Sequence, residues 1–359
     1  MSSTNPSFDR SFSMQTRTRA SSIAPIAAFF LVVILFALPF FASRSLIQDM
    51  FFILTMLVLA QFWNLLAGYG GLVSIGQQAF VGLGAYAMFG LVVLGGLDPF
   101  PAIAAGGVAA LLLAVPMAYF SFKLQGAYFA IGTWVIAEVV RLLVAQWKAV
   151  GGGTGTSLPR SATGNLMFSD TIQSMLDVRA AAANDILAYW LAVILCLVTI
   201  GGIYTLLRTK LGLGLAALRD NVEAAKSVGV DAMRIKWFVF LVAALGTGLT
   251  GALIYLQKAR ISPDAAFSVN DWTAYVIFIV VIGGIGTIEG PIIGILVFFI
   301  LQTLLADYGS WYLMTLGGLA IAVMLFAPRG LWGLVYDHTG IEIFPIRRML
   351  VGGSQSTSD

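Results

Sequence analysis

The sequence contains very few of the side chains from which catalytic and metal sites are usually built. Cys196 is the only cysteine among 359 residues, and His338 is the only histidine. One cysteine cannot form a disulfide framework or a cysteine metal site within a chain, and one histidine argues against a histidine-based catalytic site or a zinc site. Residues 151–156 are rich in glycine, but no Gly-Lys-Ser/Thr follows them, so the chain has no Walker motif for ATP. We therefore expect no catalytic residues, no metal and no cofactor bound by this chain.

Charge is also scarce. Charged residues make up 10% of the chain and hydrophobic residues 59%, whereas a soluble domain carries roughly 25% charged residues. This composition predicts an all-α, polytopic transmembrane helical bundle. The net charge of +3 is small and the basic residues are scattered near the ends of apolar runs. We therefore expect contact with the lipid bilayer and none with nucleic acid.

Long apolar runs predict about ten spans, because a spanning helix needs roughly 20 apolar residues. The runs cover residues 24–42, 46–67, 79–97, 101–122, 126–147, 187–207, 236–257, 272–288, 291–306 and 311–327. The runs at 79–97 and 272–288 are short or interrupted by glycine, which leaves open whether they cross fully or are re-entrant.

The transmembrane domain is expected over residues 24–335. A polar segment, residues 1–23, precedes it and is expected to be a disordered cytoplasmic tail. The basic residues before the first apolar run are also typical of a secretory signal. A retained first span is favoured, because the next apolar run follows within a few residues. Residues 336–359 are expected to form a cytoplasmic C-terminal tail.

The basic residues indicate the orientation of the spans. If the N-terminus is cytoplasmic, thirteen of the 20 Lys and Arg residues fall in inside segments, six fall in outside segments, and Arg141 lies within a span. Cytoplasmic loops carry the excess of positive charge. We therefore expect both termini in the cytoplasm, together with the loop 208–236, and we expect the long loop 148–186 outside.

Residues 213–229 predict an amphipathic cytoplasmic helix, held close to the membrane between two apolar runs. Its apolar stripe consists of Leu211, Leu215, Leu218, Val222, Ala225 and Val228. Charged side chains cover the other face, and Gly229 is placed to end the helix, since glycine adopts the left-handed conformation at little cost. An interfacial helix in the lipid headgroups and a docking helix for a cytosolic partner both fit this pattern.

Polar side chains inside the apolar runs are candidates for a translocation path. Glu138 and Arg141 lie three residues apart and so share one helix face. They could form a charged pair that lines the path or an ion pair with a purely structural role. The other polar or amphipathic candidates are Gln77, Gln78, Thr133 and Trp134. Two uncharged glycine-rich segments, 68–80 and 283–291, fit either broken helices lining a path or tight cytoplasmic turns.

Four sequence motifs resemble those of permeases of the branched-chain amino-acid uptake family of ABC importers. Glu223-Ala224-Ala225 followed by Gly229 resembles the cytoplasmic coupling motif of ABC-importer permeases. The strings GYGGLVSIGQQAFVGLGAY, VIGGIGTIEGPIIGILV and LFAPRGLWGL resemble three further segments of the family, in the same order over residues 46–335.

The resemblance implies a transport subunit, with the ABC-importer permease fold, in the inner membrane of a bacterium. The implied partners are a second homologous permease, two cytosolic ATPases that bind ATP and Mg, and a periplasmic solute-binding protein. The implied ATPase-coupling residues are Arg219, Asp220, Glu223, Ala224, Ala225 and Gly229. The implied solutes are branched-chain or other hydrophobic amino acids. Urea and short-amide importers carry nearly the same permease motifs and stay open as an alternative.

Two other classes of function are weaker interpretations of the same residues. An ion-coupled secondary transporter would need coupling carboxylates at mid-membrane, where only Glu138 is a candidate, and would have no use for the coupling motif. A membrane-embedded enzyme would need a cluster of catalytic residues, and the scarcity of histidine, cysteine and paired intramembrane carboxylates argues against one.

Overall fold

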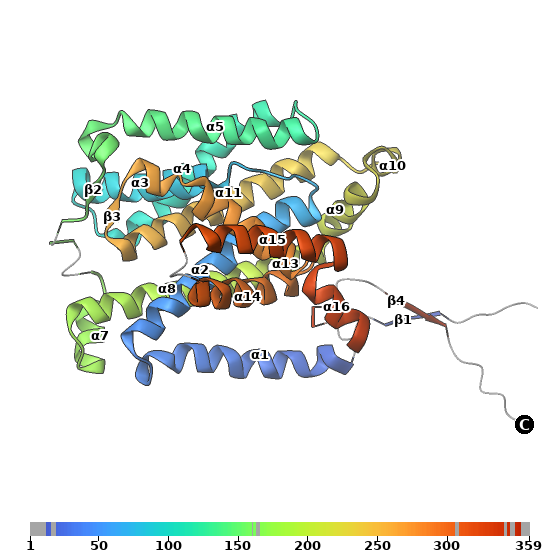
Figure 1. The fold of residues 1–359 in the computed structure, drawn as a ribbon, viewed down its shortest axis with the longest axis horizontal. Coiled ribbons are helices and arrows are strands. Elements are labelled where there is room, and N and C mark those ends of the chain that lie inside the picture. Colours follow the sequence, from blue (N-terminus) through green and yellow to red (C-terminus); the bar gives the residue numbers. More distant parts are fainter. Residues whose placement is uncertain are drawn as a thin grey trace, which may run out of the picture.

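The long helices of the chain run along one axis of the molecule (Figure 1). The computed structural model describes residues 12–15, 19–159, 161–162, 166–305, 309–340, 343–344 and 349–352. Each apolar run of the sequence coincides with a helix, as expected for a polytopic bundle. These helices are α1 (Arg19–Ala37), α2 (Arg44–Asn64), α3 (Gln77–Gly95), α4 (Pro99–Ser121), α5 (Ala127–Ala145), α8 (Ala180–Leu207), α11 (Ala232–Lys258), α13 (Tyr275–Gly283), α14 (Glu289–Leu305) and α15 (Ser310–Phe326).

Not all of these helices have the length of a full span. Within the described residues, seven are long and apolar enough to cross a membrane, or eight if α15 and α16 (Gly330–Thr339), bent by 40° at a short break, form one span. Residues 26–40 and α14 form shorter apolar helices. The expectation of about ten spans is therefore an approximation. Of the two doubtful spans, α3 has full length, and the later one belongs to a longer helical segment, Pro263–Gly283.

That segment is interrupted along its length. It begins with α12 (Pro263–Ala266), passes through the π-helical η5 (Asn270–Ala274) and ends as α13. A second π-helical turn, η2 (Leu65–Tyr69), extends α2. Such wide turns are uncommon and leave some main-chain groups in need of other partners.

The short elements gather at the two ends of the bundle. The helices α9 (Lys210–Asp220), α10 (Val222–Ser227) and α16 lie at one end, and α7 (Ser169–Leu176) lies at the other (Figure 1). Strands β2 (Thr156–Ser157) and β3 (Arg260–Ile261) pair antiparallel at the α7 end, and β1 (Phe12–Gln15) pairs antiparallel with β4 (Met349–Gly352) at the α9 end. The remaining elements are the 3-10 turns η1 (Leu38–Phe40), η3 (Lys148–Val150) and η4 (Gly152–Thr154).

Two expected segments have more structure than the sequence indicated. The loop 148–186 contains α7, and α8 begins at Ala180 rather than at 187, because the alanine run that precedes the apolar residues is strongly helix-forming. Most of the expected tail 1–23 lies outside the described residues, but its described residues are not irregular, since residues 12–15 form β1 and α1 begins at Arg19 rather than at 24.

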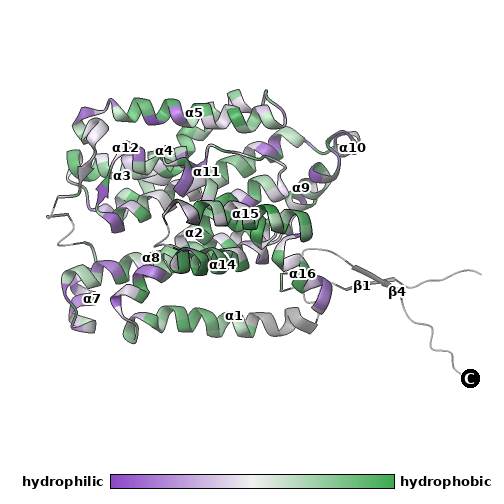
Figure 2. Ribbon diagram, in the orientation of Figure 1, coloured by the Kyte–Doolittle hydropathy of each residue, from purple (hydrophilic) through white to green (hydrophobic). Residues whose placement is uncertain are grey.

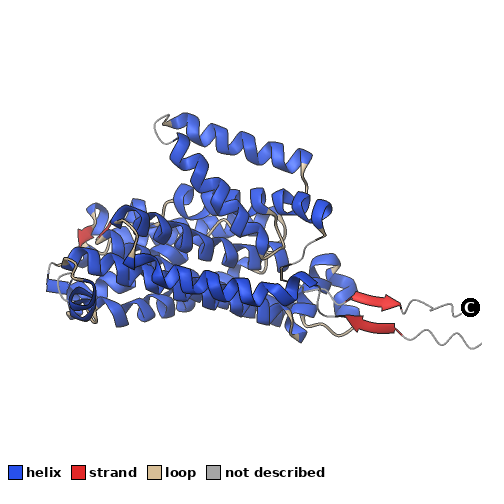
Figure 3. Cartoon of the chain, turned by 90° about the horizontal axis from the view of Figure 1, so that it is seen from below, coloured by secondary structure: helices blue, strands red, loops and turns tan. Residues whose placement is uncertain are grey.

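Hydrophobic residues follow the outer helices. Figure 2 shows them along α1, α14 and α15. The α14–α15 pair, which lies in front in Figure 1, stands out from the rest of the bundle when the molecule is viewed from below (Figure 3). The exposed apolar side chains of these helices match the lipid environment of a spanning bundle.

The centre of the bundle is a close contact of α3, α4 and α11. A Cβ placed on Gly251 of α11 would lie 2.6 Å from the Cα of Val81, and one on Gly84 of α3 would lie 2.7 Å from the Cα of Gly248. A Cβ on Gly106 of α4 would lie 2.5 Å from the carbonyl oxygen of Gly84. Because these glycines have no side chain, the three helix backbones approach more closely than larger residues would allow. Close backbone approach between membrane helices increases their van der Waals contact, which is a main source of their stability.

This packing predicts the effect of a larger residue at position 251. In Gly251→Leu the new side chain would overlap the main chain of Val81, so we expect a loss of about 1–3 kcal/mol or more in the free energy of unfolding. The matched control is Gly201→Leu, since Gly201 on α8 has no atom within 4 Å of its Cβ position. Thermal unfolding in detergent measures the difference, and equal midpoints for the two variants would contradict the packing role of Gly251.

Candidate functional site

The segment between α8 and α11 projects from one end of the bundle as two short helices. The Thr209 hydroxyl caps α9 by accepting from the Leu211 amide. Leu215 and Leu218 of α9 and Ala225 of α10 are buried, so the apolar stripe expected from the sequence faces the bundle. The opposite side of α10 carries exposed Glu223 and Ala224.

A single helix over residues 213–229 was the wrong expectation. The helix breaks at Asn221, whose backbone is extended and whose Oδ1 accepts from the amides of Glu223 and Ala224, each at 3.0 Å. An asparagine side chain satisfies the first amides of a new helix well, so a new helix start competes with continuation of the old one. As a result Val228 leaves the buried stripe and is 77% exposed.

Gly229 ends the second helix as expected. Its φ is +85°, in the left-handed region that favours glycine, and nothing lies within 4 Å of its Cβ position. A side chain there would strain the backbone without colliding with a neighbour.

The residues expected to contact an ATPase lie on both short helices. Glu223 binds Lys226 at 2.9 Å on the surface of α10. Arg219 lies on α9 and lines a cavity of about 320 Å³ together with Gly286, Thr287 and Glu289. Asp220 ends α9, and its side chain lies outside the described part of the chain.

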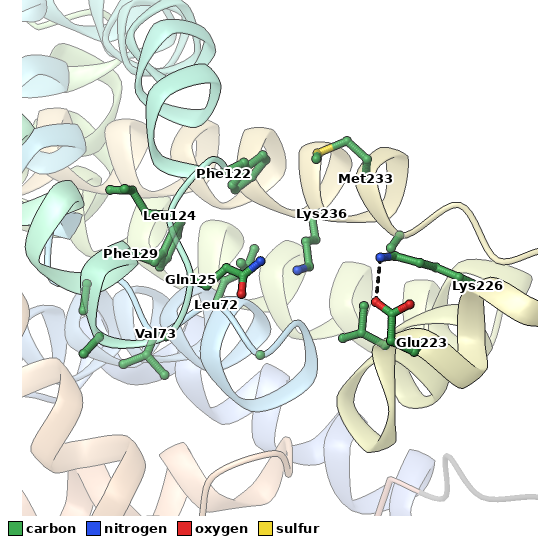
Figure 4. A pocket seen from close by; sticks show the side chains of 16 residues that line it. Leu72, Val73, Phe122, Leu124, Gln125, Phe129, Glu223, Lys226, Met233 and Lys236 are labelled. Atoms are coloured by element: carbon green, nitrogen blue, oxygen red, sulfur yellow. Dashed lines mark hydrogen bonds and ion pairs between the residues drawn. The ribbon is translucent and has the colours of Figure 1, made fainter.

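A larger cavity of about 710 Å³ separates α10 from the bundle. It is bounded by α10, the start of α11 and the turns that precede α3 and α5. Figure 4 shows Lys236 of α11 reaching into this space, with the Glu223–Lys226 pair on one side and Gln125 on the other. Because of this cavity, α10 contacts the rest of the molecule mainly through the face that carries the buried Ala225.

Three of the expected path residues are buried and hydrogen-bonded at the start of α3. The Nε2 of Gln77 donates to the carbonyl oxygen of Leu59 and to Thr247 Oγ1, and the Oε1 of Gln78 accepts from Thr273 Oγ1. The hydroxyl oxygen of Thr133 on α5 accepts from the Ile75 amide at 3.1 Å. Within this chain these side chains hold helices together.

The other three expected path residues lie on α5, at the edge of the bundle in Figure 1. Trp134 is 46% exposed, and Glu138 and Arg141 are partly exposed. Arg141 binds Glu138 through Nε and Nη2 at 2.9 and 2.5 Å, as the sequence spacing predicts. It also binds Asp264 of α12 at 2.6 Å, a partner that the sequence did not indicate.

Sequence reasoning also missed two amide side chains of α2. Gln61 and Asn64 are buried and bind the main chain of residues 286–288. The two glycine-rich segments meet nearby, where a Cβ on Gly68 would lie 2.6 Å from the Gly286 amide nitrogen. The available signal was two strongly polar residues three apart in an otherwise apolar run. Within the described residues, no three His, Cys, Asp or Glu side chains form a group that could hold a metal.

Comparison with known proteins is consistent with this arrangement. The family model described as branched-chain amino acid transport system / permease component matches residues 45–328. The chain belongs to this family. It is accordingly a multi-pass membrane protein and a permease subunit of an ABC importer, in which ATP hydrolysis resides in a separate subunit.

Individual relatives are more distant. The permease proteins LivM of the high-affinity branched-chain amino acid transport systems of Salmonella typhimurium and Escherichia coli are each 28% identical over 312 residues, which is 84% of this chain and 73% of theirs. The probable branched-chain amino acid permease LivH of Methanocaldococcus jannaschii is 28% identical over 160 residues, 42% of this chain and 47% of its own. No solved structure matches the chain significantly.

The double pairing of Arg141 predicts how variants of this permease behave. Glu138→Gln leaves Arg141 bound to Asp264, so we expect a loss of less than about 1 kcal/mol in the free energy of unfolding, as is usual for a partly exposed ion pair. Glu138→Gln combined with Asp264→Asn leaves Arg141 without either carboxylate, and the loss should exceed the sum of the single losses. Thermal unfolding of the three variants measures this, and simple additivity would show that the two carboxylates act independently.

Proposed function

We propose that this permease carries branched-chain amino acids across the inner membrane of a bacterium in an importer driven by two cytosolic ATPases. A second, homologous permease completes the membrane path, and a periplasmic solute-binding protein delivers the solute. The observation that carries the proposal is the match to the permease family over residues 45–328. The solute is inferred from the two LivM proteins that align with 84% of the chain.

The α9–α10 segment is the proposed docking element for an ATPase. It projects from the bundle end, buries Leu215 and Leu218 inward and presents Glu223, Ala224 and the turn at Gly229 outward. Small residues such as Ala224 allow close approach of a partner surface. ATP and Mg are proposed to bind to the ATPases alone, since this chain has no Walker motif.

Charge and geometry together support a proposed orientation of the chain. The α9–α10 end contains the loop 208–236, which is rich in Lys and Arg, and strands β1 and β4 near the two termini lie at the same end. The positive-inside rule makes this the cytoplasmic end. The end with α7 then faces the solute-binding protein.

The proposed path runs between this chain and the second permease, along the start of α3 and the exposed side of α5. Trp134, Glu138 and Arg141 lie on the side of α5 that the chain itself leaves open. A homologous partner is supported by the similarity of this chain to both the LivM and the LivH proteins. Gln77, Gln78 and Thr133 are proposed to fix α3 against α11, η5 and α5, and so to shape the path from behind.

The coupling proposal predicts the behaviour of two variants in proteoliposomes that contain the complete complex. Glu223→Lys reverses an exposed charge on α10, and Gly229→Asp strains the turn by roughly 1–2 kcal/mol. Both should insert normally, yet ATP-driven uptake of leucine and ATPase activity stimulated by the loaded binding protein should each fall on the order of tenfold.

Asp337→Lys on α16 is the matched control. It reverses a charge in another exposed ion pair, with Arg329, at the same end of the molecule but off the docking element. We expect it to transport at nearly the unmodified rate. Normal uptake by both α10 variants with ATPases bound would leave the segment as an interfacial anchor, and absence of leucine uptake by the unmodified complex would refute the proposed solute.

The orientation has its own test. Met167→Cys at the α7 end and Leu213→Cys at the α9 end place exposed thiols on opposite sides, while Cys196 is buried. A membrane-impermeant maleimide should label position 167 in intact spheroplasts and position 213 only after permeabilisation. The reverse pattern would invert the proposed topology.

A further inference from the structure

Two buried amide side chains of α2 bind the non-helical segment between α13 and α14. The Nδ2 of Asn64 donates to the carbonyl oxygen of Thr287 at 2.7 Å, and its Oδ1 accepts from the Gly286 amide at 2.8 Å. One turn away, the Nε2 of Gln61 donates to the carbonyl oxygen of Ile288 at 2.7 Å. Asn64 is 0% exposed, so water does not compete for either of its bonds.

These bonds replace those that a continuous helix would make. Residues 284–288 are not helical, and Gly284 and Gly286 have φ values of +134° and +77°. A main-chain group left unpaired away from water costs several kcal/mol in an apolar setting. The side chain of Asn64 satisfies one donor and one acceptor of this segment at once, so it fixes the position of the segment relative to α2.

The two segments also meet at the level of the backbone. A Cβ placed on Gly68 of η2 would lie 2.6 Å from the Gly286 amide nitrogen and would overlap Asn64 Oδ1. Only a residue without a side chain fits there. Contact this close leaves little room for α2 and residues 284–288 to move separately.

The other side of the same segment faces α9. Arg219 of α9 and Gly286 line the 320 Å³ cavity, and a Cβ on Gly286 would lie 3.2 Å from Arg219 Nη1. Residues 284–288 therefore lie between the docking element and α2. A shift of α9 toward the bundle would therefore press on this segment as well as on α8 and α11, which α9 also contacts.

Hydrogen bonds continue the connection from α2 to α5. The indole Nε1 of Trp63, next to Asn64, donates to the carbonyl oxygen of Ser74 at 2.8 Å, and the following amide, of Ile75, donates to Thr133 Oγ1 on α5. The connection joins the docking element to the helix that lines the proposed path. Arg219 is exposed, and every later group on the route is buried or partly buried.

We propose that Asn64 is a positioning residue for transport, which makes α2 and residues 284–288 move as one body when α9 is displaced by the ATPase. The inference rests on the proposed function and adds to it the route by which the displacement reaches α5. Asn64 touches neither solute nor ATPase in this role; it transmits movement because both of its bonds would break if the two segments separated.

The test compares two buried polar residues in reconstituted complexes. Asn64→Leu keeps a similar volume and removes both bonds, whereas Thr250→Val removes an equally buried hydroxyl that binds only Gly246 of its own helix. We expect Asn64→Leu to assemble and to retain unstimulated ATPase activity, while leucine taken up per ATP hydrolysed falls on the order of tenfold. In Thr250→Val the ratio of leucine uptake to ATP hydrolysis should stay near that of the unmodified complex, because the lost hydrogen bond lies within a single helix.

Equal losses in the two variants, or a normal ratio in Asn64→Leu, would overturn the proposal. Failure of the unmodified complex to couple ATP to uptake would instead refute the proposed function. If Asn64→Leu does not reach the membrane, a second experiment tests whether α2 and residues 284–288 move together. It uses a chain that keeps Asn64, carries Cys196→Ala, and has spin labels at Leu46→Cys of α2 and at Ile285→Cys. Their separation should be the same in nucleotide-free and ATP-bound complexes, and a shift on ATP binding would show that the segments move independently.

Discussion

The structure depends on one constraint, which is that main-chain polar groups within an apolar layer must find partners inside the protein. Continuous helices meet it by themselves, and most of this chain is continuous helix. Two departures from continuous helix, residues 70–76 and 284–288, lie against buried parts of other helices, and there polar side chains supply the missing bonds. The breaks therefore explain the buried polar side chains around them. The two breaks lie near each other because adjacent residues of α2, Trp63 and Asn64, each bind one of them.

The sequence predicts the helical content of the molecule because apolar length and helix formation are local properties. Each of the ten apolar runs contains a helix, although the run 272–288 ends in the non-helical residues 284–288. The inward stripe of α9 and α10 was identified from its spacing, except for the exposed Val228. The sequence does not predict which polar group binds which main-chain atom. Asn64 and Gly286 are more than two hundred positions apart, and nothing in either neighbourhood specifies the other. Asp264 was missed as a partner of Arg141 for the same reason.

The break at Asn221 was missed for a different reason. The residues that cause it are neighbours in the sequence, but they carry two competing signals. Leucine and alanine spacing continues in phase through residues 211–225, so periodicity alone predicts one helix. The asparagine side chain competes with that periodicity by capping a new helix at Glu223 and Ala224. The result is a pair of short helices that can tilt relative to each other at one residue. Such a pair fits the proposed docking element better than one rigid helix would.

The side-chain partners at the breaks also determine what a movement of the helices would cost. Bending a continuous helix at mid-membrane would expose main-chain groups that have no other partner, at a cost of several kcal/mol for each group. At a break the partners are side chains, which can rotate with the segment they hold and keep their bonds while the helices around them shift. The segment 284–288 has glycine at two positions with positive φ, and it touches α9 on one side and α2 on the other. A displacement at the end of the bundle can thus pass into its interior without unpairing a buried group, provided that the side chain at position 64 retains both its donor and its acceptor.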